Sequence, residues 1–235
     1  MLKDYIAVDL EMTGLDPRRD HILEIGAVKV KDKKVQGTFS RLIRQEDALK
    51  EQIVKLTGIT DEMAAAGDEP DAAVEAFLEF AEDCVWVGHN VIFDYSFIRQ
   101  WEINHRIKRT CYGVDTLKIA RKCLPELEKK TLDFLCGYYQ IAGNTRHRAL
   151  EDAQADQALY EILEQNFLEK QPGLFVKKEL QYKAKRQTPA TPRQKNYLKV
   201  LMKYYKIEPD VPIEQLTRSD ASRLTDKILR QYGRI

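Results

Sequence analysis

The sequence predicts an α/β domain followed by a small all-α module. Three observations support this prediction. The first part of the chain alternates apolar and polar residues at the period of a strand. A short apolar run near residue 85 then lies between segments with helical spacing, and beyond residue 170 prolines and lysines precede two more helical stretches. With 235 residues, 43% hydrophobic and 32% charged, the chain is long enough for one domain with an appendage.

Three strands are predicted at the start of the domain. Tyr5–Met12 is largely apolar, and HILEIGAVKVKDKKV and QGTFSRLIR follow it. The alternation in IGAVKVKD and the turn-forming KDKK predict that successive strands pair in antiparallel fashion. The nearly continuous apolar run CVWVGHN predicts a buried central strand.

Helices are predicted over most of the remaining domain. Thr60 is placed to cap the helical region TDEMAAAGDEPDAAVEAFLEFAED, and Phe97, Ile98 and Trp101 have helical spacing in DYSFIRQWEINH. Three further helical segments follow: DTLKIARKCLP, TLDFLCGYYQI and HRALEDAQADQALYEILEQNFLE. Strands followed by helices that alternate with a strand predict an α/β domain over residues 1–169.

The net charge of +1 conceals an asymmetry along the chain. Residues 170–235 contain 16 Lys and Arg against 6 Asp and Glu, whereas residues 1–169 contain 22 against 31. A basic segment is a candidate for binding a polyanion such as nucleic acid, and the alternative is that the lysines promote solubility. We interpret residues 170–190, with their prolines and lysines, as a basic linker.

Residues 191–235 are predicted to form a small helical module. Thr191 and Pro192 are suited to the start of one helix, and Thr217 or Ser219 to the start of a second that ends at Gly233. In the first helix one face is expected to hold the residues Tyr197, Leu198, Leu201, Met202 and Tyr205. The segments TPRQKNYLKVL and LTRSDASRLTDKIL resemble SAP-like helical modules appended to DNA enzymes.

Several classes of protein are disfavoured by composition. No apolar run approaches the roughly 20 residues of a membrane span, and the N-terminal segment enters a strand pattern at once instead of a signal peptide. The four cysteines show no CxxC spacing, so we expect reduced packing residues. We therefore expect a cytoplasmic protein with no membrane partner.

Two acidic residues lie inside the first predicted strand. Residues two apart on a strand share a face, so Asp9 and Glu11 point the same way while Val8 and Leu10 pack on the other side. Burying unpaired carboxylates is costly. Because no basic residue neighbours them in sequence, a hard divalent cation such as Mg²⁺ or Mn²⁺ is the natural partner. The alternative is an edge strand whose acids face water.

Further candidate ligands follow the second buried strand and begin the last helix. Asp94 opens a helix, where an acid is also favoured by electrostatics alone. His147 precedes the helix that contains Asp152, at a spacing that lets an imidazole reach a metal-bound water as a general base. A lone histidine is otherwise a structural residue. We expect His89 to be structural and Asp156 to be solvated or to lie behind the ligands.

The five residues in the order D-x-E, D, H-x4-D resemble the DEDDh 3′→5′ exonucleases, the DnaQ-like group that includes polymerase III proofreading domains of the epsilon and PolC types. The resemblance covers about residues 1–169 and rests on VDLEMTGLD, LTGIT, GHNVIFDYSFI, VDTLKIAR and HRALEDAQAD. Met12 stands where most of the DNA enzymes have Thr, and with Met at this position the first motif resembles that of oligoribonucleases. The preference for DNA or RNA therefore stays open.

The resemblance implies both a fold and a set of roles. The fold is ribonuclease-H-like, with a mixed five-stranded sheet flanked by helices. Two divalent cations, Mg²⁺ or Mn²⁺, are implied at the catalytic acids Asp9, Glu11, Asp94 and Asp152, with His147 as general base. The implied pocket for the 3′-terminal nucleotide is lined by Met12, Thr13, Leu56, Thr57, Asn90 and Phe93.

Three functions remain open from the sequence. The leading one is a metal-dependent 3′→5′ exonuclease that releases nucleoside 5′-monophosphates from single-stranded or frayed DNA ends, alone or with a DNA polymerase as partner. The second is a 3′→5′ exoribonuclease or oligoribonuclease. The third is a non-catalytic nucleic-acid-binding protein, which the intact set of five residues disfavours.

Overall fold

The computed structural model describes residues 2–141, 148–183, 188–207 and 212–233. The chain divides into two compact units, which we describe separately. The first contains residues 1–102 and 108–183, and the second contains residues 184–235 with the short segment 103–107.

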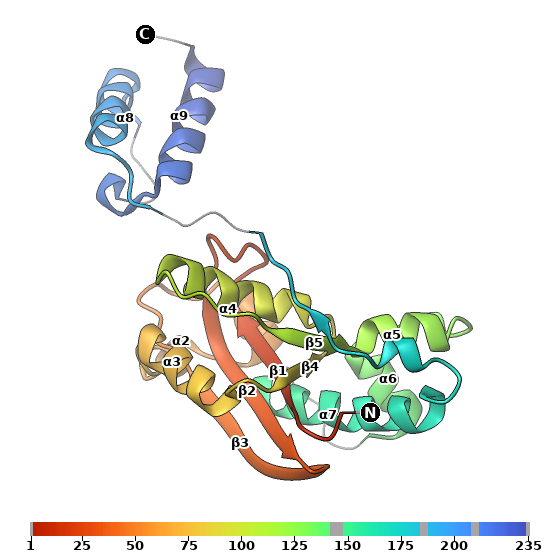
Figure 1. Cartoon of the computed structure of the whole chain (residues 1–235). Coiled ribbons are helices and arrows are strands. Elements are labelled where there is room, and N and C mark those ends of the chain that lie inside the picture. Colours follow the sequence, from red (N-terminus) through yellow and green to blue (C-terminus); the bar gives the residue numbers. More distant parts are fainter. Residues whose placement is uncertain (1, 142–147, 184–187, 208–211, 234–235) are drawn as a thin grey trace. The chain divides into compact units, whose positions relative to one another are not determined.

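The first unit is built on one mixed sheet with the strand order β3-β2-β1-β4-β5-β6 (Figure 1). The strands are β1 (Tyr5–Met12), β2 (Ile22–Lys31), β3 (Lys34–Leu42), β4 (Val85–Gly88), β5 (Tyr112–Asp115) and β6 (Lys178–Glu179). Strands β1, β2 and β3 pair in antiparallel fashion, β4 and β5 add in parallel, and β6 is antiparallel to β5. The α/β class and the mixed sheet are confirmed, but within the described residues the sheet has six strands and not five.

The helices of the described chain lie between and after these strands. They are α1 (Glu51–Thr57), α2 (Asp61–Ala65), α3 (Pro70–Ala81), α4 (Ile92–Asn104), α5 (Thr116–Cys123), α6 (Leu132–Tyr139), α7 (Ala149–Phe167), α8 (Pro192–Tyr205) and α9 (Arg218–Tyr232), with 3-10 turns η1 (Pro172–Leu174) and η2 (Ile213–Gln215). The predicted caps are confirmed, because Thr60, Thr191 and Thr217 each accept a hydrogen bond from a first-turn backbone N–H.

The β2–β3 hairpin turns on two residues in the left-handed region. Asp32 and Lys33 have φ of 47° and 61°, the conformation of the tight turn whose twist matches that of paired strands. Asp32 tolerates this backbone because a short polar side chain is compatible with it. The hairpin fixes the register of β2 against β3, and on its other side β2 pairs with β1 so that Glu11 lies opposite Glu24.

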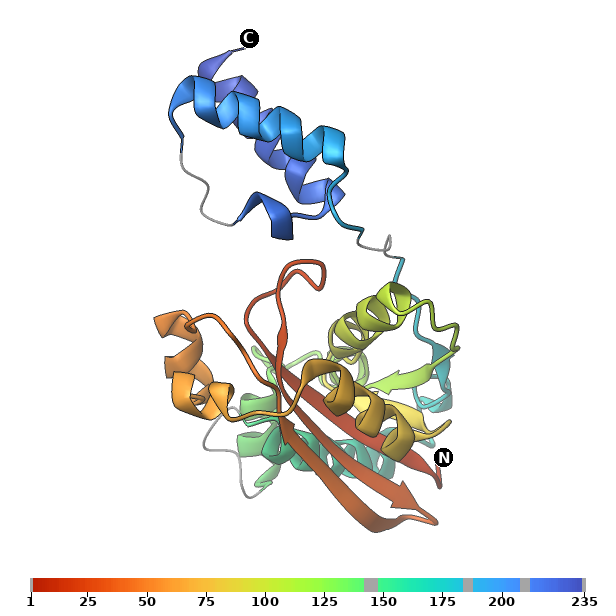
Figure 2. The same cartoon turned by 90° about the vertical axis from the view of Figure 1, so that its left-hand side faces the viewer.

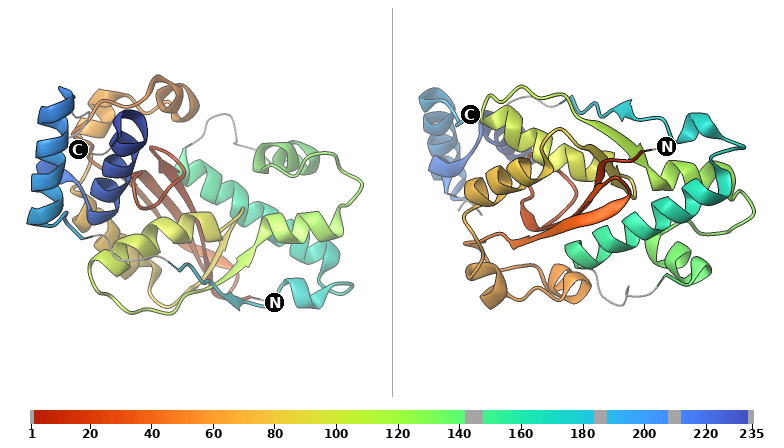
Figure 3. Two further views of the ribbon diagram at one scale, coloured as in Figure 1. Left: turned by 90° about the horizontal axis from the view of Figure 1, so that it is seen from above. Right: turned by 60° about the horizontal axis from the view of Figure 1, so that its bottom comes forward.

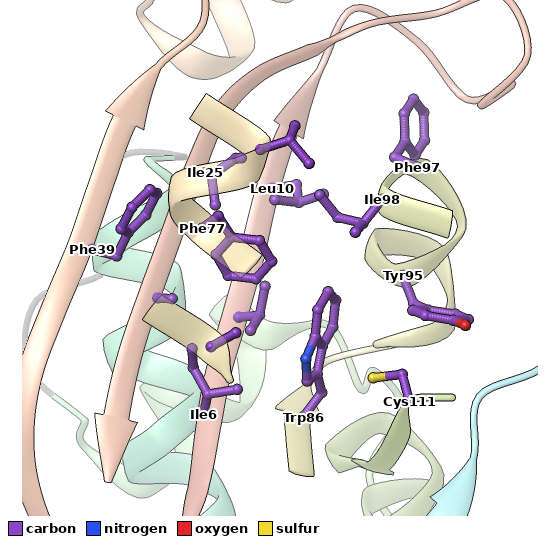
Figure 4. Packing of buried hydrophobic residues seen from close by; sticks show 14 of the residues in the cluster. Ile6, Leu10, Ile25, Phe39, Phe77, Trp86, Tyr95, Phe97, Ile98 and Cys111 are labelled. Atoms are coloured by element: carbon purple, nitrogen blue, oxygen red, sulfur yellow. The ribbon is translucent and has the colours of Figure 1, made fainter. Parts of the chain in front are cut away.

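Helices lie on both faces of the sheet (Figures 2 and 3), and each face has its own hydrophobic core. One face packs against α3 and α4 through aromatic contacts, including the edge contact of Trp86 with Phe77 at 5.3 Å between ring centroids (Figure 4). The other face packs against α5, α6 and α7, and α7 lies along β1 and β2. Successive residues of β1 therefore alternate between two cores, which is why the strand is apolar on both sides.

The expected linker is partly a structural element of the first unit. Phe175 and Leu180 are buried, and the intervening β6 pairs with the edge of β5. Gly113 lacks a Cβ where the Leu180 side chain packs. The prediction that residues 170–190 form a linker is therefore wrong for residues up to 183, because apolar residues among the lysines bury themselves at the sheet edge.

The second unit is a pair of helices, α8 and α9, with its own small core. Leu198, Leu201 and Ile228 are buried at its centre. Tyr197, which we expected on the core face of α8, is instead 40% exposed, while Tyr205 does turn inward. The prediction for Tyr197 is wrong because the inward stripe begins at Leu198, one residue further along the helix.

Across the residues that the structure describes, none of the helices combines the length and the apolar character that crossing a membrane requires.

Candidate active site

The first strand presents its two acids to the face of the sheet that carries α7. Val8 and Leu10 belong to the core under α3 and α4, whereas Tyr5 and Ala7 belong to the core under α7. Asp9 and Glu11 continue this second set by alternation. The opposite placement of Val8 and Leu10 is thus as the sequence pattern predicted.

Asp9, Glu11 and Asp152 form one acidic cluster. A carboxylate oxygen of each lies within 4.8 Å of the others, although the residues come from β1 and the first turn of α7. Asp152 and Glu11 are buried, and Asp9 is half-buried. Three converging oxygens are a suitable ligand set for a hard divalent cation.

Asp94 reaches the same end of β1 from the start of α4. Strand β4 pairs with β1 only as far as Ala7, and the Leu10 N–H beyond that point donates to Asp94 Oδ1 at 3.2 Å. The carboxylate thus replaces a backbone partner that the shorter strand does not supply. The pKa of Asp9 is raised mainly by burial and next by the charge of Asp94, which places Asp94 electrostatically with the cluster.

The electrostatics of the cluster favour a cation. Burial, together with the charge of the Asp152 carboxylate, raises the pKa of Glu11 to about 8. Burial also raises the pKa of Asp94 to about 7 and that of Asp9 well above its ordinary value. Ionised acids in this position repel one another and lack water, so a divalent cation matches both the geometry and the charge.

The N-terminus of α7 is fixed to β2 by a buried ion pair that the sequence did not reveal. Glu24 is 1% exposed and accepts two hydrogen bonds from Arg148, at 2.6 and 2.9 Å, and one from the Ala149 N–H at 3.1 Å. At Gly26 a Cβ would overlap the backbone of Ala149. These contacts place Asp152 over β1, and they hold the Arg148 guanidinium against Glu24, from where its charge offsets only part of the rise in the pKa of Glu11.

A second layer of polar contacts supports the cluster from behind. Asp156 is fully buried and accepts hydrogen bonds from the His89 N–H at 2.8 Å and the Thr116 hydroxyl at 3.2 Å. We expected Asp156 either to be solvated or to lie behind the ligands. Its burial agrees with the second alternative and contradicts the first. The ring of His89 is bonded at both nitrogens, which supports the structural role predicted for it.

The residues expected to line a nucleotide pocket are distributed unevenly. Met12 and Thr13 follow the acids directly and are half-buried, and the Thr13 hydroxyl accepts the His21 N–H at 2.9 Å. Phe93 is half-buried at the start of α4, where it makes an edge contact with Phe97. Asn90 is exposed in the left-handed region, with φ of 72°.

The two remaining residues of the expected pocket lie on α1 and differ in burial. Leu56 is half-exposed on α1, whereas Thr57 is buried with its hydroxyl bonded to the Ile53 carbonyl at 3.0 Å. The Thr57 hydroxyl also accepts the Ile59 N–H at 3.1 Å, so it stabilises the end of the helix. His147, the expected general base, lies outside the described residues.

Residues 6–160 match the model of the exonuclease family RNase_T. The chain belongs to the RNase T exonuclease family. Its curated relatives include DNA polymerase III PolC-type of Caldanaerobacter subterraneus subsp. tengcongensis, 35% identical over 159 residues, and that of Staphylococcus haemolyticus, 32% identical over 225 residues. These alignments cover 67% and 88% of this chain but only 11% and 16% of the relatives.

Solved structures share the fold of this RNase T family member. Exonuclease X in complex with 5′-overhanging duplex DNA matches with a TM-score of 0.54 at 24% identity, over 69% of this chain and 92% of that chain. E. coli Exonuclease I in complex with a dT13 oligonucleotide matches with a TM-score of 0.59 at 22% identity, over 74% and 43%. These likenesses confirm the ribonuclease-H-like, DnaQ-type fold.

Proposed function

We propose that this chain is a 3′→5′ exonuclease that hydrolyses the terminal phosphodiester of a single-stranded or frayed DNA end and releases a nucleoside 5′-monophosphate. The observation that carries the proposal is the convergence of Asp9, Glu11 and Asp152 within one metal-sized space, with Asp94 bonded to the same strand end. Membership of the exonuclease family gives this geometry its chemical meaning.

The donor set supports a cation-binding role. Asp9, Glu11, Asp94 and Asp152 would hold two divalent cations, Mg²⁺ or Mn²⁺, which would acidify the attacking water and stabilise the charge on the departing 3′-oxygen. His147 is our candidate to take the proton from the attacking water. The Glu24–Arg148 pair takes no part in the chemistry and has a positioning role, because it keeps the start of α7 in place.

The terminal nucleotide is proposed to lie beside the acids. Met12 and Thr13 extend directly from β1, and their backbone would meet the 3′-hydroxyl. The Phe93 ring would pack against the sugar or base, with Asn90 and Leu56 at the margin of the pocket. Thr57 would contribute through its backbone or methyl group, since its hydroxyl is already bonded within the chain.

DNA is the substrate that the similarities favour. The curated relatives are named as DNA polymerases, and the two structural matches are complexes with DNA. An exoribonuclease is the alternative, motivated by Met12. Association with a DNA polymerase stays a prediction that rests on the names of the PolC-type relatives.

The deciding experiment compares initial rates on 5′-labelled DNA and RNA oligomers of the same sequence, with Mg²⁺ or Mn²⁺ and with EDTA. We expect metal-dependent shortening from the 3′ end, faster on DNA. Asp9→Asn should abolish it, while Asp47→Asn, a change at an exposed loop acid, should not. Faster cleavage of RNA would establish the ribonuclease, and undiminished cleavage by Asp9→Asn would refute the site.

A further inference from the structure

Helix α8 has an exposed face of aromatic and apolar side chains that nothing in the second unit covers within the described residues. Tyr197, Val200 and Tyr204 are 40%, 53% and 67% exposed. Their spacing of three and four residues places them on one side of the helix, spanning roughly 10 Å at a rise of 1.5 Å per residue. The buried side, Leu198 and Leu201, faces the core that α8 shares with α9.

Cations border this face. Arg193 lies one turn before Tyr197 and Lys203 lies one turn from Val200, and both side chains are exposed. Neither enters an ion pair with any residue that the structure describes. In contrast, the ammonium groups of Lys195 and Lys199 both bond to the carboxylate of Glu214, at 2.6 and 2.9 Å, so that acid is already neutralised within the unit.

We propose that the exposed face of α8 is a binding surface for a single-stranded polynucleotide, with Tyr197 and Tyr204 stacking on unpaired bases and Arg193 and Lys203 contacting phosphates. Tyrosine rings between cations are the arrangement that binds single strands without sequence preference. This surface extends the proposed function, because it gives the substrate strand a second contact outside the acidic cluster, and it rests on that function for the choice of DNA.

Charge selects this occupant over others. Residues 191–235 contain ten Lys and Arg against five Asp and Glu, so a polyanion is attracted at long range. A second copy of α8 packed symmetrically on this face would bring Arg193 and Lys203 towards the same cations of the partner. Duplex DNA offers phosphates but keeps its bases stacked, which leaves the tyrosine rings without partners.

The exposed tyrosines of α8 and α9 differ in how their rings contact Tyr205. Tyr204 makes an edge contact with Tyr205 at 4.9 Å, which restrains its ring while leaving most of its surface open. On α9, Tyr232 stacks on Tyr205 at 5.0 Å, so one face of its ring is already covered by an aromatic ring, in contrast to the edge contact of Tyr204. The exposed cations Lys227 and Arg230 therefore provide a matched control on a surface without an aromatic stripe.

The test measures fluorescence anisotropy of a labelled oligo(dT) of about 20 nucleotides, with the full chain in EDTA so that no cleavage occurs. Tyr197→Ala with Tyr204→Ala should weaken binding roughly fivefold or more. The pair Tyr197→Phe and Tyr204→Phe should stay within twofold of wild type, because phenylalanine also stacks. An unfolding transition of the alanine variant that matches wild type excludes misfolding as the cause.

The salt dependence tests the cations separately. Arg193→Ala with Lys203→Ala should reduce the slope of log K against log salt concentration by about 1.4, since each phosphate contact on a single strand contributes about 0.7. Lys227→Ala with Arg230→Ala, which removes the same charge from α9, should leave most of the slope. Equal effects of the two pairs would overturn the assignment to α8.

A third measurement keeps this proposal distinct from the proposed function. Cleavage of a labelled trinucleotide, which leaves few bases free for a second surface, should be unchanged in the α8 variants. If wild type cleaves neither the trinucleotide nor a longer DNA oligomer with Mg²⁺ or Mn²⁺ while oligo(dT) binding still depends on α8, the proposed function fails alone. Unchanged oligo(dT) affinity in the tyrosine-to-alanine variant overturns the proposal for α8. The same holds if the substitutions convert a dimer into a monomer and leave the oligo(dT) affinity unchanged.

Discussion

Replacing Glu11 by Gln removes one charge from the acidic cluster with little change in side-chain size. In the metal-free protein we expect Glu11→Gln to increase the free energy of unfolding near pH 8. The carboxyl has a pKa of about 8 in the folded chain against an ordinary 4.5, because it is buried beside Asp152. The folded state therefore binds this proton more tightly than the unfolded chain does.

The pH dependence follows from this difference. The stability that the protonated carboxyl provides is fully present below about pH 4.5 and is lost as the pH rises through about 8. Integration over the two pKa values gives a loss on the order of 4 kcal/mol near pH 8 and about 1 kcal/mol near pH 5. Glutamine has no proton to lose, so the variant should be more stable than wild type mainly near pH 8.

Urea unfolding in EDTA, followed by tryptophan fluorescence near pH 5 and near pH 8, measures the effect. Glu75→Gln, which neutralises an exposed acid on α3, is the matched control and should change little at either pH. The reasoning is refuted if Glu11→Gln is no more stable than wild type near pH 8, or if its gain is the same at both pH values. Exonuclease activity of Glu11→Gln should be lost in every case.

The other predictions concern cation binding and the packing of the start of α7 against β2. Excess Mg²⁺ or Mn²⁺ should stabilise wild type by about 2.7 kcal/mol at a hundred times Kd, and calorimetry should show a much smaller gain for Asp152→Asn. Gly26→Ala should lower the free energy of unfolding in urea by about 1–3 kcal/mol, because its methyl group would overlap the backbone of Ala149. The control Gly37→Ala should change it little, because a Cβ there lies 3.7 Å from the nearest atom. Equal losses in the two variants would contradict the overlap. Arg148→Ala should cost about 2–3 kcal/mol and lower kcat by leaving its buried carboxylate partner unpaired, with partial rescue by Lys; full activity of Arg148→Ala would show that the pair does not position α7.

Local chemistry was sufficient for much of the fold. Tyr5–Met12 forms β1 as predicted, because an apolar run of β-forming residues has few other options. The alternation of that strand also placed Asp9 and Glu11 on one face, since the side-chain period of a strand is two. The caps Thr191 and Thr217 followed from their own sequence, because a hydroxyl accepts a bond within the next turn.

The tertiary structure decided what depends on distant partners. β6 consists of two residues, Lys178–Glu179, and their own sequence resembles a linker; they pair only because the edge of β5 is open beside them. The ion pair of Glu24 with Arg148 joins residues 124 positions apart, and no local pattern marks it. Register across strands and the docking of α7 created it, since both require the whole sheet to be assembled.

The acidic cluster itself divides in the same way. The sequence by itself determined which acids exist and that two of them share a strand face. Only the tertiary structure brought Asp152 within 4.8 Å of that pair and raised their pKa values, because burial and mutual repulsion arise when α7 closes over β1. Desolvation is a property of the assembled core, and it is the reason why these carboxylates suit a cation.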